Sequence, residues 1–220
     1  MIGFYNYTVL LTYLGFSSSV LGIILAMTGH TFAAIFCLMF SGLCDMFDGK
    51  VARTKKNRTN DERQFGIQLD SLSDLVCFGI LPSVIGFKIG LREPYMLVVL
   101  VFYSLAALIR LAYFNVLEIN RNSSEPVVNY TGLPVTSAAL VFPFIYIFKK
   151  FLGKYFALVY GLILLIVGIL FISKIKIKKP NIKVMISFIV IGVIEILLII
   201  SVCKFLWYIY VVKEIVKIIL

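Results

Sequence analysis

The chain has 220 residues, of which 61% are hydrophobic and only 15% are charged, and its formal net charge is +10. A soluble domain is roughly half apolar and a quarter charged, so this composition excludes an ordinary water-soluble protein and predicts a polytopic membrane protein. In such a protein, excess positive charge serves topology and anionic lipid before nucleic acid, so we expect membrane lipids as neighbours and no nucleic-acid partner.

Apolar runs, taken in chain order, predict an all-α bundle of about eight transmembrane helices in one membrane domain, 1–220. Charged or Pro-containing segments at 54–65, 118–133 and 174–183 predict loops, and Pro82 predicts a kink in the third helix. The last run is short and carries charge, so a span and an interfacial helix are both open for it. The predicted helices are 6–28, 31–53, 66–87, 95–117, 134–148, 155–172, 184–203 and 205–220.

Four carboxylates flank the predicted loop 54–65. Asp45 and Asp48 are three residues apart, and Asp70 and Asp74 are four apart, so each pair shares one face of its helix. If the two helices are antiparallel neighbours, the four carboxylates meet and repel unless a divalent cation binds them. A set of oxygen ligands favours Mg²⁺, Mn²⁺ or Ca²⁺ over Zn²⁺. The alternative is that all four simply reach water at the membrane surface.

The full pattern resembles a known signature. Asp45-x2-Asp48-Gly49-x2-Ala52-Arg53, followed by Gly66-x3-Asp70-x3-Asp74, is similar to the motif of the CDP-alcohol phosphatidyltransferases. The resemblance implies a six-helix catalytic core, a homodimer, and transfer of a phosphatidyl group from a cytidine diphosphate carrier to an alcohol. It implies Mg²⁺ or Mn²⁺ as cofactor.

The same resemblance implies roles for individual residues. Asp45, Asp48, Asp70 and Asp74 are expected to bind metal, with Asp74 also as the general base. Gly49, Ala52, Arg53 and Gly66 are expected to contact the CDP moiety. Twelve residues separate Arg53 from Gly66, which is longer than the family's usual spacing. The metal ligands and acceptor site are expected within 31–149, and C-terminal membrane helices within 150–220.

Three further segments resemble the phosphatidylserine synthases of this family: 69–83, Ile109–Asn115 and Tyr130–Val135. They imply CDP-diacylglycerol and L-serine as substrates, with phosphatidylserine and CMP as products. Arg110 lies within an apolar run, where a guanidinium is a good bidentate partner for a carboxylate or a phosphate. A contact with serine, a contact with the lipid diphosphate and a structural ion pair all remain open for it. Tyr113 stands where the related enzymes often have a second arginine.

Two alternative functions are open. Another enzyme of the family, with glycerol phosphate or inositol phosphate as acceptor, would call for more basic residues in the pocket. A cation transporter would call for carboxylates near mid-membrane and a paired repeat, and no repeat is visible. Glu195, in the seventh run, is expected in an interior or subunit-interface pair, and its role is open.

Basic residues predict the orientation. With eight spans, fifteen of the 21 Lys and Arg residues lie on the motif side, which the positive-inside rule places in the cytoplasm. We therefore expect an active site at the cytoplasmic face of a prokaryotic cell membrane. The four cysteines all lie in apolar runs without paired spacing, and we expect neither a disulfide nor a metal role for Cys37, Cys44, Cys77 and Cys203.

Overall fold

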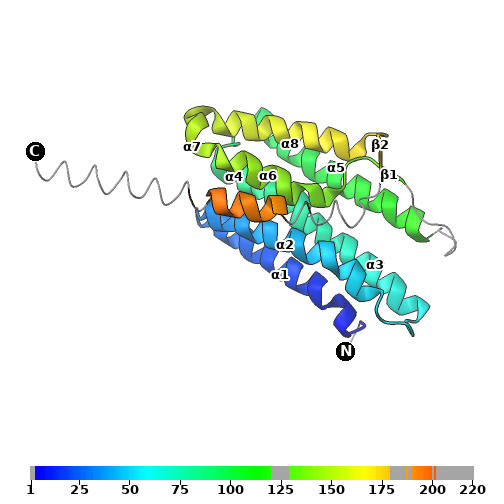
Figure 1. The fold of residues 1–220 in the computed structure, drawn as a ribbon. Helices are drawn as coiled ribbons and strands as arrows, with labels where there is room; N and C mark the ends of the chain where they lie inside the picture. The colour runs from blue at the N-terminus through cyan, green and yellow to red at the C-terminus, as the bar shows by residue number, and fades with distance from the viewer. Residues whose placement is uncertain (1–2, 120–128, 179–186, 188–189, 200, 202–220) are drawn as a thin grey trace, which may run out of the picture.

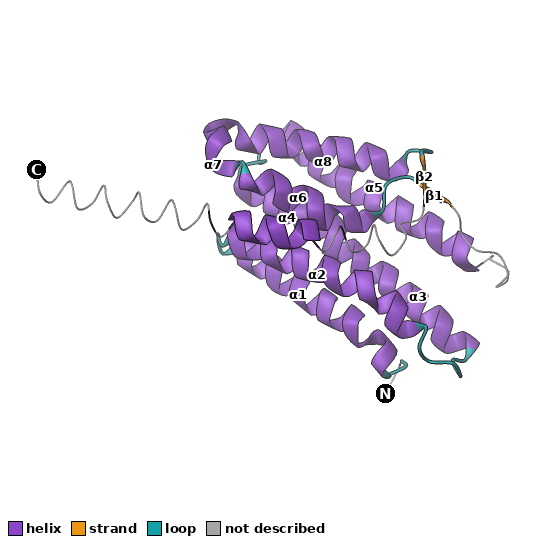
Figure 2. Ribbon diagram, in the orientation of Figure 1, coloured by secondary structure: helices purple, strands orange, loops and turns teal. Residues whose placement is uncertain are grey.

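A computed structural model describes residues 3–119, 129–178, 187, 190–199 and 201. It is a bundle of long helices that run roughly side by side (Figure 1), with one short strand pair at one end (Figure 2). The main helices are α1 Leu10–Met27, α2 Thr31–Ala52, α3 Asn60–Asp74, α4 Leu81–Ile89, α5 Pro94–Ile119, α6 Ala138–Ile147, α7 Lys149–Leu152 and α8 Phe156–Ile172.

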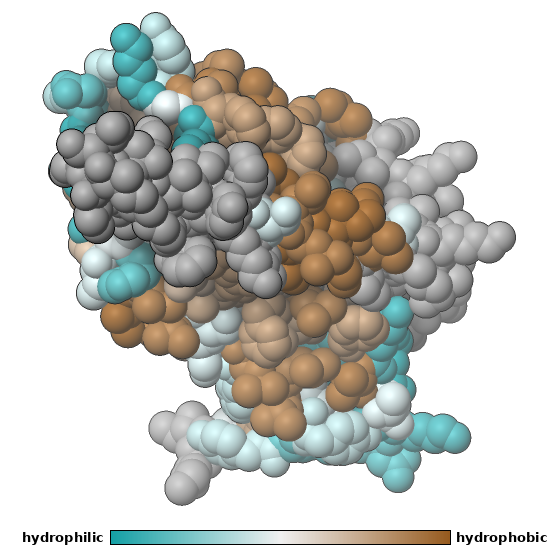
Figure 3. Space-filling view, turned by 60° about the vertical axis from the view of Figure 1, so that its left-hand side comes forward, coloured by the Kyte–Doolittle hydropathy of each residue, from teal (hydrophilic) through white to brown (hydrophobic). Residues whose placement is uncertain are grey.

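Among the described residues, five helical segments are long and apolar enough to cross a membrane: Tyr7–Met27, Thr31–Ala52, Asn60–Ile89, Pro94–Leu117 and Lys149–Ile172. Two shorter apolar helices, Val135–Ile147 and Val190–Ile199, accompany them. Hydrophobic side chains gather over the middle of the face in Figure 3, and hydrophilic ones at its margins. The expected all-α polytopic membrane protein is confirmed. The run predicted at 205–220 lies outside the described residues.

The third helix begins six residues earlier than the sequence analysis predicts. Asn60–Phe65 were assigned to a loop because they are polar and charged, but they form the first turns of α3. Thr59 caps this helix: its hydroxyl accepts from the Glu62 N–H at 3.2 Å, and the Glu62 carboxylate accepts from the Thr59 N–H at 3.2 Å. This reciprocal pair satisfies N–H groups that a helix start leaves open. The connecting loop is therefore shorter than 54–65.

The predicted irregularity at Pro82 takes the form of a π-helical segment, η2 Leu75–Ile80, between α3 and α4. Pro82 has no N–H to donate to the carbonyl of Phe78, four residues earlier. The buried hydroxyl of Tyr103 on α5 donates to that carbonyl instead, at 2.7 Å. The Tyr160 hydroxyl on α8 donates to the carbonyl of Pro82 at 3.1 Å. The two tyrosines therefore fasten α5 and α8 to the irregular turn.

Close packing of α2 against α6 supports the acidic end of α2. A Cβ on Gly42 would lie 2.3 Å from the Cβ of Ala139, so only glycine permits this approach. Gly42 lies one turn before Asp45, so this contact brings the start of α6 beside the aspartate. Small residues at helix contacts are typical of membrane bundles.

A two-stranded antiparallel sheet ties the segment before α6 to the segment after α8. β1 Asn129–Thr131 pairs with β2 Lys176–Lys178, with Tyr130 opposite Ile177. The N–H of Gly132, at a φ of 76°, donates to the carbonyl of Ile175 at 2.8 Å. Loops were predicted for both segments. The pairing fixes how the chain enters α6.

The three cysteines in the described part of the chain, Cys37, Cys44 and Cys77, are free thiols, as predicted. Cys203 lies outside the described residues.

Candidate active site

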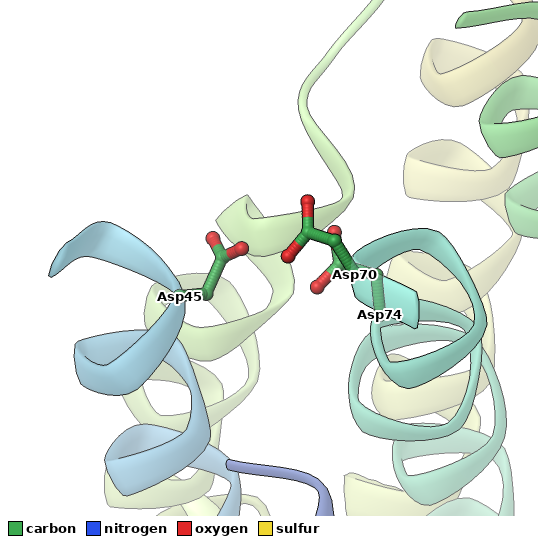
Figure 4. Close-up of side chains that lie close together, drawn as sticks. All are labelled: Asp45, Asp70 and Asp74. Carbon is green, nitrogen blue, oxygen red and sulfur yellow. The ribbon is translucent and has the colours of Figure 1, made fainter. Parts of the chain in front are cut away.

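Two helices present the acidic residues to each other. Asp45 and Asp48 lie near the end of α2, and Asp70 and Asp74 lie on α3, across the connecting loop. Figure 4 shows Asp45 pointing from α2 toward Asp70 and Asp74 on α3. One carboxylate oxygen from each of these three residues lies within 4.8 Å of the others. The predicted meeting of the two acidic helix faces is therefore present in the fold.

This group of carboxylates fits a hard divalent cation. Oxygens bound to one such ion at roughly 2.1–2.5 Å are at most about 4–5 Å apart, which matches the spacing here. In the described part of the chain, the structure shows one salt bridge, Lys55–Glu62, and it does not involve any of these aspartates. Carboxylates gathered without a cationic side chain are stabilised by a metal ion. The donor set is oxygen alone, which suits Mg²⁺ or Mn²⁺.

Asp48 is not one of this group of three, but its side chain contacts that of Asp70. It is buried, and its Oδ2 accepts a hydrogen bond from Thr12 Oγ1 on α1 at 3.2 Å. It lines the same small cavity as Asp45, Asp70 and Asp74. This cavity has a volume of about 10 Å³, room for roughly one water molecule or ion. A ligand much larger than an ion would not fit inside it.

The entry to α6 completes one side of the site. The side chain of Thr136 lies beside the Asp45 carboxylate. Thr136 belongs to the short 3₁₀ turn η3 Val135–Ser137 that precedes α6. The backbone of Leu133, just before this turn, is anchored to α8 because its N–H donates to the carbonyl of Leu170 at 3.0 Å. A hydroxyl donor is thereby held at the edge of the acidic cluster.

The residues expected to contact the CDP moiety differ in their surroundings. Gly49 is exposed, and a Cβ there would meet nothing within 4 Å, so that face of α2 is open. Ala52 is partly buried, and Arg53 caps α2 and attracts Asp48 electrostatically. Gly66 is covered: a Cβ there would lie 2.1 Å from Nη2 of Arg58, in the loop before α3.

Arg110, the expected acceptor ligand, is buried on α5 and only 8% exposed. Its guanidinium lies over the ring of Phe114, 4.5 Å from the ring centroid. Tyr113, at the position of the family's second arginine, is exposed instead. One turn beyond Arg110, Asn115 accepts a 2.6 Å hydrogen bond from Ser71, the neighbour of Asp70. The α5 segment is thus joined to the acidic face of α3.

The sequence analysis missed three contributors to this site. Thr12, Thr136 and Arg58 all come from outside the α2 and α3 signature positions. Thr12 and Thr136 are single hydroxyls in apolar or turn segments, and no spacing distinguishes them. For Arg58, the loop that carries it is longer than the family's usual spacing, but loop length does not specify where the side chain lies.

Comparison with known sequences shows which family and which proteins this chain is similar to. A sequence model of the CDP-alcohol phosphatidyltransferase family matches residues 5–172. A CDP-diacylglycerol–serine O-phosphatidyltransferase of Saccharomyces cerevisiae is 37% identical over 150 residues, 65% of this chain and 53% of that protein. An archaetidylserine synthase of Methanothermobacter thermautotrophicus is 32% identical over 173 residues, covering 78% of this chain and 69% of that protein. A CDP-diacylglycerol–serine O-phosphatidyltransferase of Helicobacter pylori is 33% identical over 162 residues, 68% of this chain and 61% of that protein. The match thus spans about half the length of the yeast relative.

Proposed function

The chain belongs to the CDP-alcohol phosphatidyltransferase family, and we propose that it transfers the phosphatidyl group of CDP-diacylglycerol to the hydroxyl of L-serine. The products would be phosphatidylserine and CMP. The observation that carries the proposal is the meeting of Asp45 on α2 with Asp70 and Asp74 on α3, with one carboxylate oxygen of each within 4.8 Å of the others. Names of relatives support the acceptor: the archaeal protein is named for a different lipid from the yeast and bacterial proteins, yet all three are named for serine.

The carboxylates would hold Mg²⁺ or Mn²⁺. Asp45, Asp70 and Asp74 are the nearest set, and Asp48 is available through the shared cavity. When bound, the metal would neutralise the diphosphate and stabilise the charge that develops during displacement. The task of the protein is to keep these oxygens fixed, and the Thr12 hydroxyl restrains the Asp48 carboxylate for this purpose.

In the proposed reaction, the serine hydroxyl oxygen attacks the phosphorus that bears diacylglycerol. The bond from that phosphorus to the oxygen bridging the two phosphates breaks, and CMP leaves with the bonding electrons. Asp74 would take the proton of the hydroxyl. An aspartate is a weak base for a hydroxyl, so correct positioning of the serine matters as much as proton transfer.

Arg110 would hold the serine carboxylate. Phe114 lies against its guanidinium, which is 4.5 Å from the ring centroid. A guanidinium edge can donate two parallel hydrogen bonds to a carboxylate. Glycerol phosphate and inositol phosphate carry a further phosphate, and the exposed Tyr113 adds no cation at the position where related enzymes often have one.

The active site would face the cytoplasm. The end of α2, the start of α3 and the strand pair lie toward the same end of the bundle, and the loop 53–59 there carries Arg53, Lys55, Lys56 and Arg58. The positive-inside rule retains such short basic loops in the cytoplasm. Water-soluble CMP would then be released where it can be reused. A homodimer remains a prediction from the family resemblance, to be tested by cross-linking in the membrane.

The deciding experiment is an assay of CMP release from CDP-diacylglycerol by the purified full chain in detergent. Serine, glycerol 3-phosphate, inositol phosphate and serinol are supplied separately, with Mg²⁺ or Mn²⁺. We expect rapid CMP release with L-serine and formation of phosphatidylserine. Release with glycerol 3-phosphate or inositol phosphate in preference to serine would reassign the acceptor.

A further inference from the structure

The loop between α2 and α3 places a guanidinium on the acidic face of α3. Arg58 Nη2 donates to the carbonyl of Glu62 at 3.1 Å and lies over Gly66. A Cβ at Gly66 would be 2.1 Å from that nitrogen, so the glycine provides the space that the guanidinium occupies. A side chain at position 66 would displace Arg58.

This location is aligned with the proposed metal ligands. Gly66, Asp70 and Asp74 follow one another at intervals of four residues on α3, so their Cα–Cβ directions share one face of the helix. Successive positions of this kind are about 5–6 Å apart. The guanidinium of Arg58 therefore lies about one helical turn from Asp70, on the side toward the loop.

The charge of Arg58 is incompletely satisfied within the described part of the chain. Its Nε is buried and has no hydrogen-bond partner there. The carboxylate of Glu62 is engaged elsewhere: Lys55 Nζ donates to it at 2.7 Å, and the Thr59 N–H at 3.2 Å. A partly buried guanidinium whose N–H donors lack acceptors costs free energy unless an anion accepts hydrogen bonds from them.

We propose that Arg58, seated on Gly66, binds a phosphate oxygen of the cytidine diphosphate carrier. This inference rests on the proposed function, and it gives the loop a part in holding the nucleotide. The small cavity lined by the aspartates has no room for the diphosphate, so its phosphates would lie outside this cavity, on the side toward the start of α3 and Arg58. Arginine suits this contact because its planar fork can meet two phosphate oxygens.

The test is titration of the purified full chain in neutral-lipid nanodiscs with Mn²⁺, using CMP and cytidine as separate probes. The Arg58→Ala variant should bind CMP about ten- to a hundredfold more weakly than the parent, because one charge-assisted contact is lost. Cytidine, which lacks phosphate, should bind both proteins alike. Arg58→Lys should recover part of the CMP affinity. The matched control is Lys56→Ala, which removes an equal charge from an exposed position in the same loop and should bind CMP like the parent.

Gly66→Ala tests whether Arg58 must lie over Gly66 to bind CMP. This variant should bind CMP about as weakly as Arg58→Ala, and the double variant should bind CMP little more weakly than Arg58→Ala alone. An equal further loss in that background would overturn the seating, because Gly66 would then contact the nucleotide itself.

Three outcomes would overturn the contact between Arg58 and phosphate. The first is unchanged CMP affinity in Arg58→Ala when the parent binds CMP. The second is equal loss of CMP and cytidine affinity, which indicates a structural role and is checked by the melting temperature. The third is a loss that appears only in nanodiscs containing anionic lipid, which would make a lipid headgroup the ligand. If the parent itself neither binds CMP nor releases it from CDP-diacylglycerol, the proposed function fails instead.

Discussion

Thr12 and Asp48 are joined by a buried hydrogen bond across 36 positions of sequence, from Oγ1 on α1 to Oδ2 on α2 at 3.2 Å. Both side chains are buried, with exposed fractions of 8% each. In low-dielectric surroundings such a bond holds a carboxylate in one orientation more firmly than it would in water. The first transmembrane helix therefore contributes a hydroxyl donor beside the proposed metal site, although it carries no acidic residue.

Thr12→Val should weaken metal-dependent activity while preserving the fold. Valine has nearly the shape of threonine but cannot donate a hydrogen bond, so Asp48 loses its restraint. Losses of such supporting partners typically cost 10–100-fold in metal affinity or activity. The measurement is CMP release as a function of Mn²⁺ concentration. Thr12→Ser, which keeps the hydroxyl, is the control. Equal Mn²⁺ dependence in Thr12→Val and the parent would show that the bond is incidental.

Replacing any of Asp45, Asp70 or Asp74 by asparagine should reduce turnover at least about a hundredfold, because each change removes a ligand charge from the closest set. Asp48→Asn should also impair turnover. Asp61→Asn, an exposed acidic residue in the first turn of α3, is the matched control. Near-normal turnover of Asp45→Asn or Asp70→Asn at low metal concentration would remove that residue from the metal site.

Chelation provides a separate test of the cofactor. EDTA should abolish CMP release by the parent protein, and added Mg²⁺ or Mn²⁺ should restore it, since the gathered carboxylates otherwise repel one another. Comparing the two metals at equal free concentration identifies the preferred ion. Activity that persists after exhaustive chelation would exclude the proposed role of the metal.

Sidedness can be measured with a single cysteine in the loop before α3. Thr59 is unsuitable because it caps the helix, whereas Asn57 is exposed in the same loop. In a variant otherwise free of cysteine, Asn57→Cys should resist membrane-impermeant thiol reagents in intact cells and react in inverted vesicles. Labelling in intact cells would reverse the orientation given by the basic residues.

The sequence predicted the parts of this site that depend on residues close together in the chain. The aspartates share helix faces because spacings of three and four are local properties of a helix, and the glycine–arginine pattern around them identified the family. The early start of α3 was missed although its signal was local: Thr59 followed three residues later by Glu62 is a capping pair. The charged residues inside that first turn were read as a loop.

Contacts between distant segments had no comparable signal. Arg58 occupies the space above Gly66 because the loop folds back onto α3, and the length of the loop alone does not specify that path. The strand pair joins Tyr130 to Ile177 through backbone hydrogen bonds, which leave little trace in side-chain patterns. The Tyr103 hydroxyl reaches the Phe78 carbonyl from another helix. Such pairings depend on the assembled bundle.

Tyr103→Phe should destabilise the protein without affecting metal binding. The Tyr103 hydroxyl satisfies the carbonyl that Pro82 leaves open, and an unsatisfied buried acceptor costs about 1–3 kcal/mol. The melting temperature in detergent should fall, whereas that of Tyr95→Phe, at an exposed tyrosine on the same helix, should not. If both variants melt like the parent, another donor satisfies the Phe78 carbonyl.

Arg110→Ala should raise the Michaelis constant for serine much more than that for CDP-diacylglycerol. The Arg110 guanidinium is buried and stacked 4.5 Å from the Phe114 ring, so it is a fixed cation suited to a carboxylate. A charge-assisted hydrogen bond is worth about 1.5–3 kcal/mol, or roughly ten- to a hundredfold in affinity. Arg110→Lys should recover only part of this, because a point charge cannot reproduce the fork.

Two controls separate a role of Arg110 in serine binding from general damage to α5. Tyr113→Phe changes an exposed neighbour on the same helix and should leave both Michaelis constants near those of the parent. Serinol keeps the hydroxyl and amine of serine but lacks the carboxylate. It should be a poor acceptor for the parent and lose little more with Arg110→Ala, because the contact that the mutation removes is already missing. If Arg110→Ala weakens CDP-diacylglycerol alone and leaves serine saturation unchanged, Arg110 serves the diphosphate and the serine carboxylate is held by another residue.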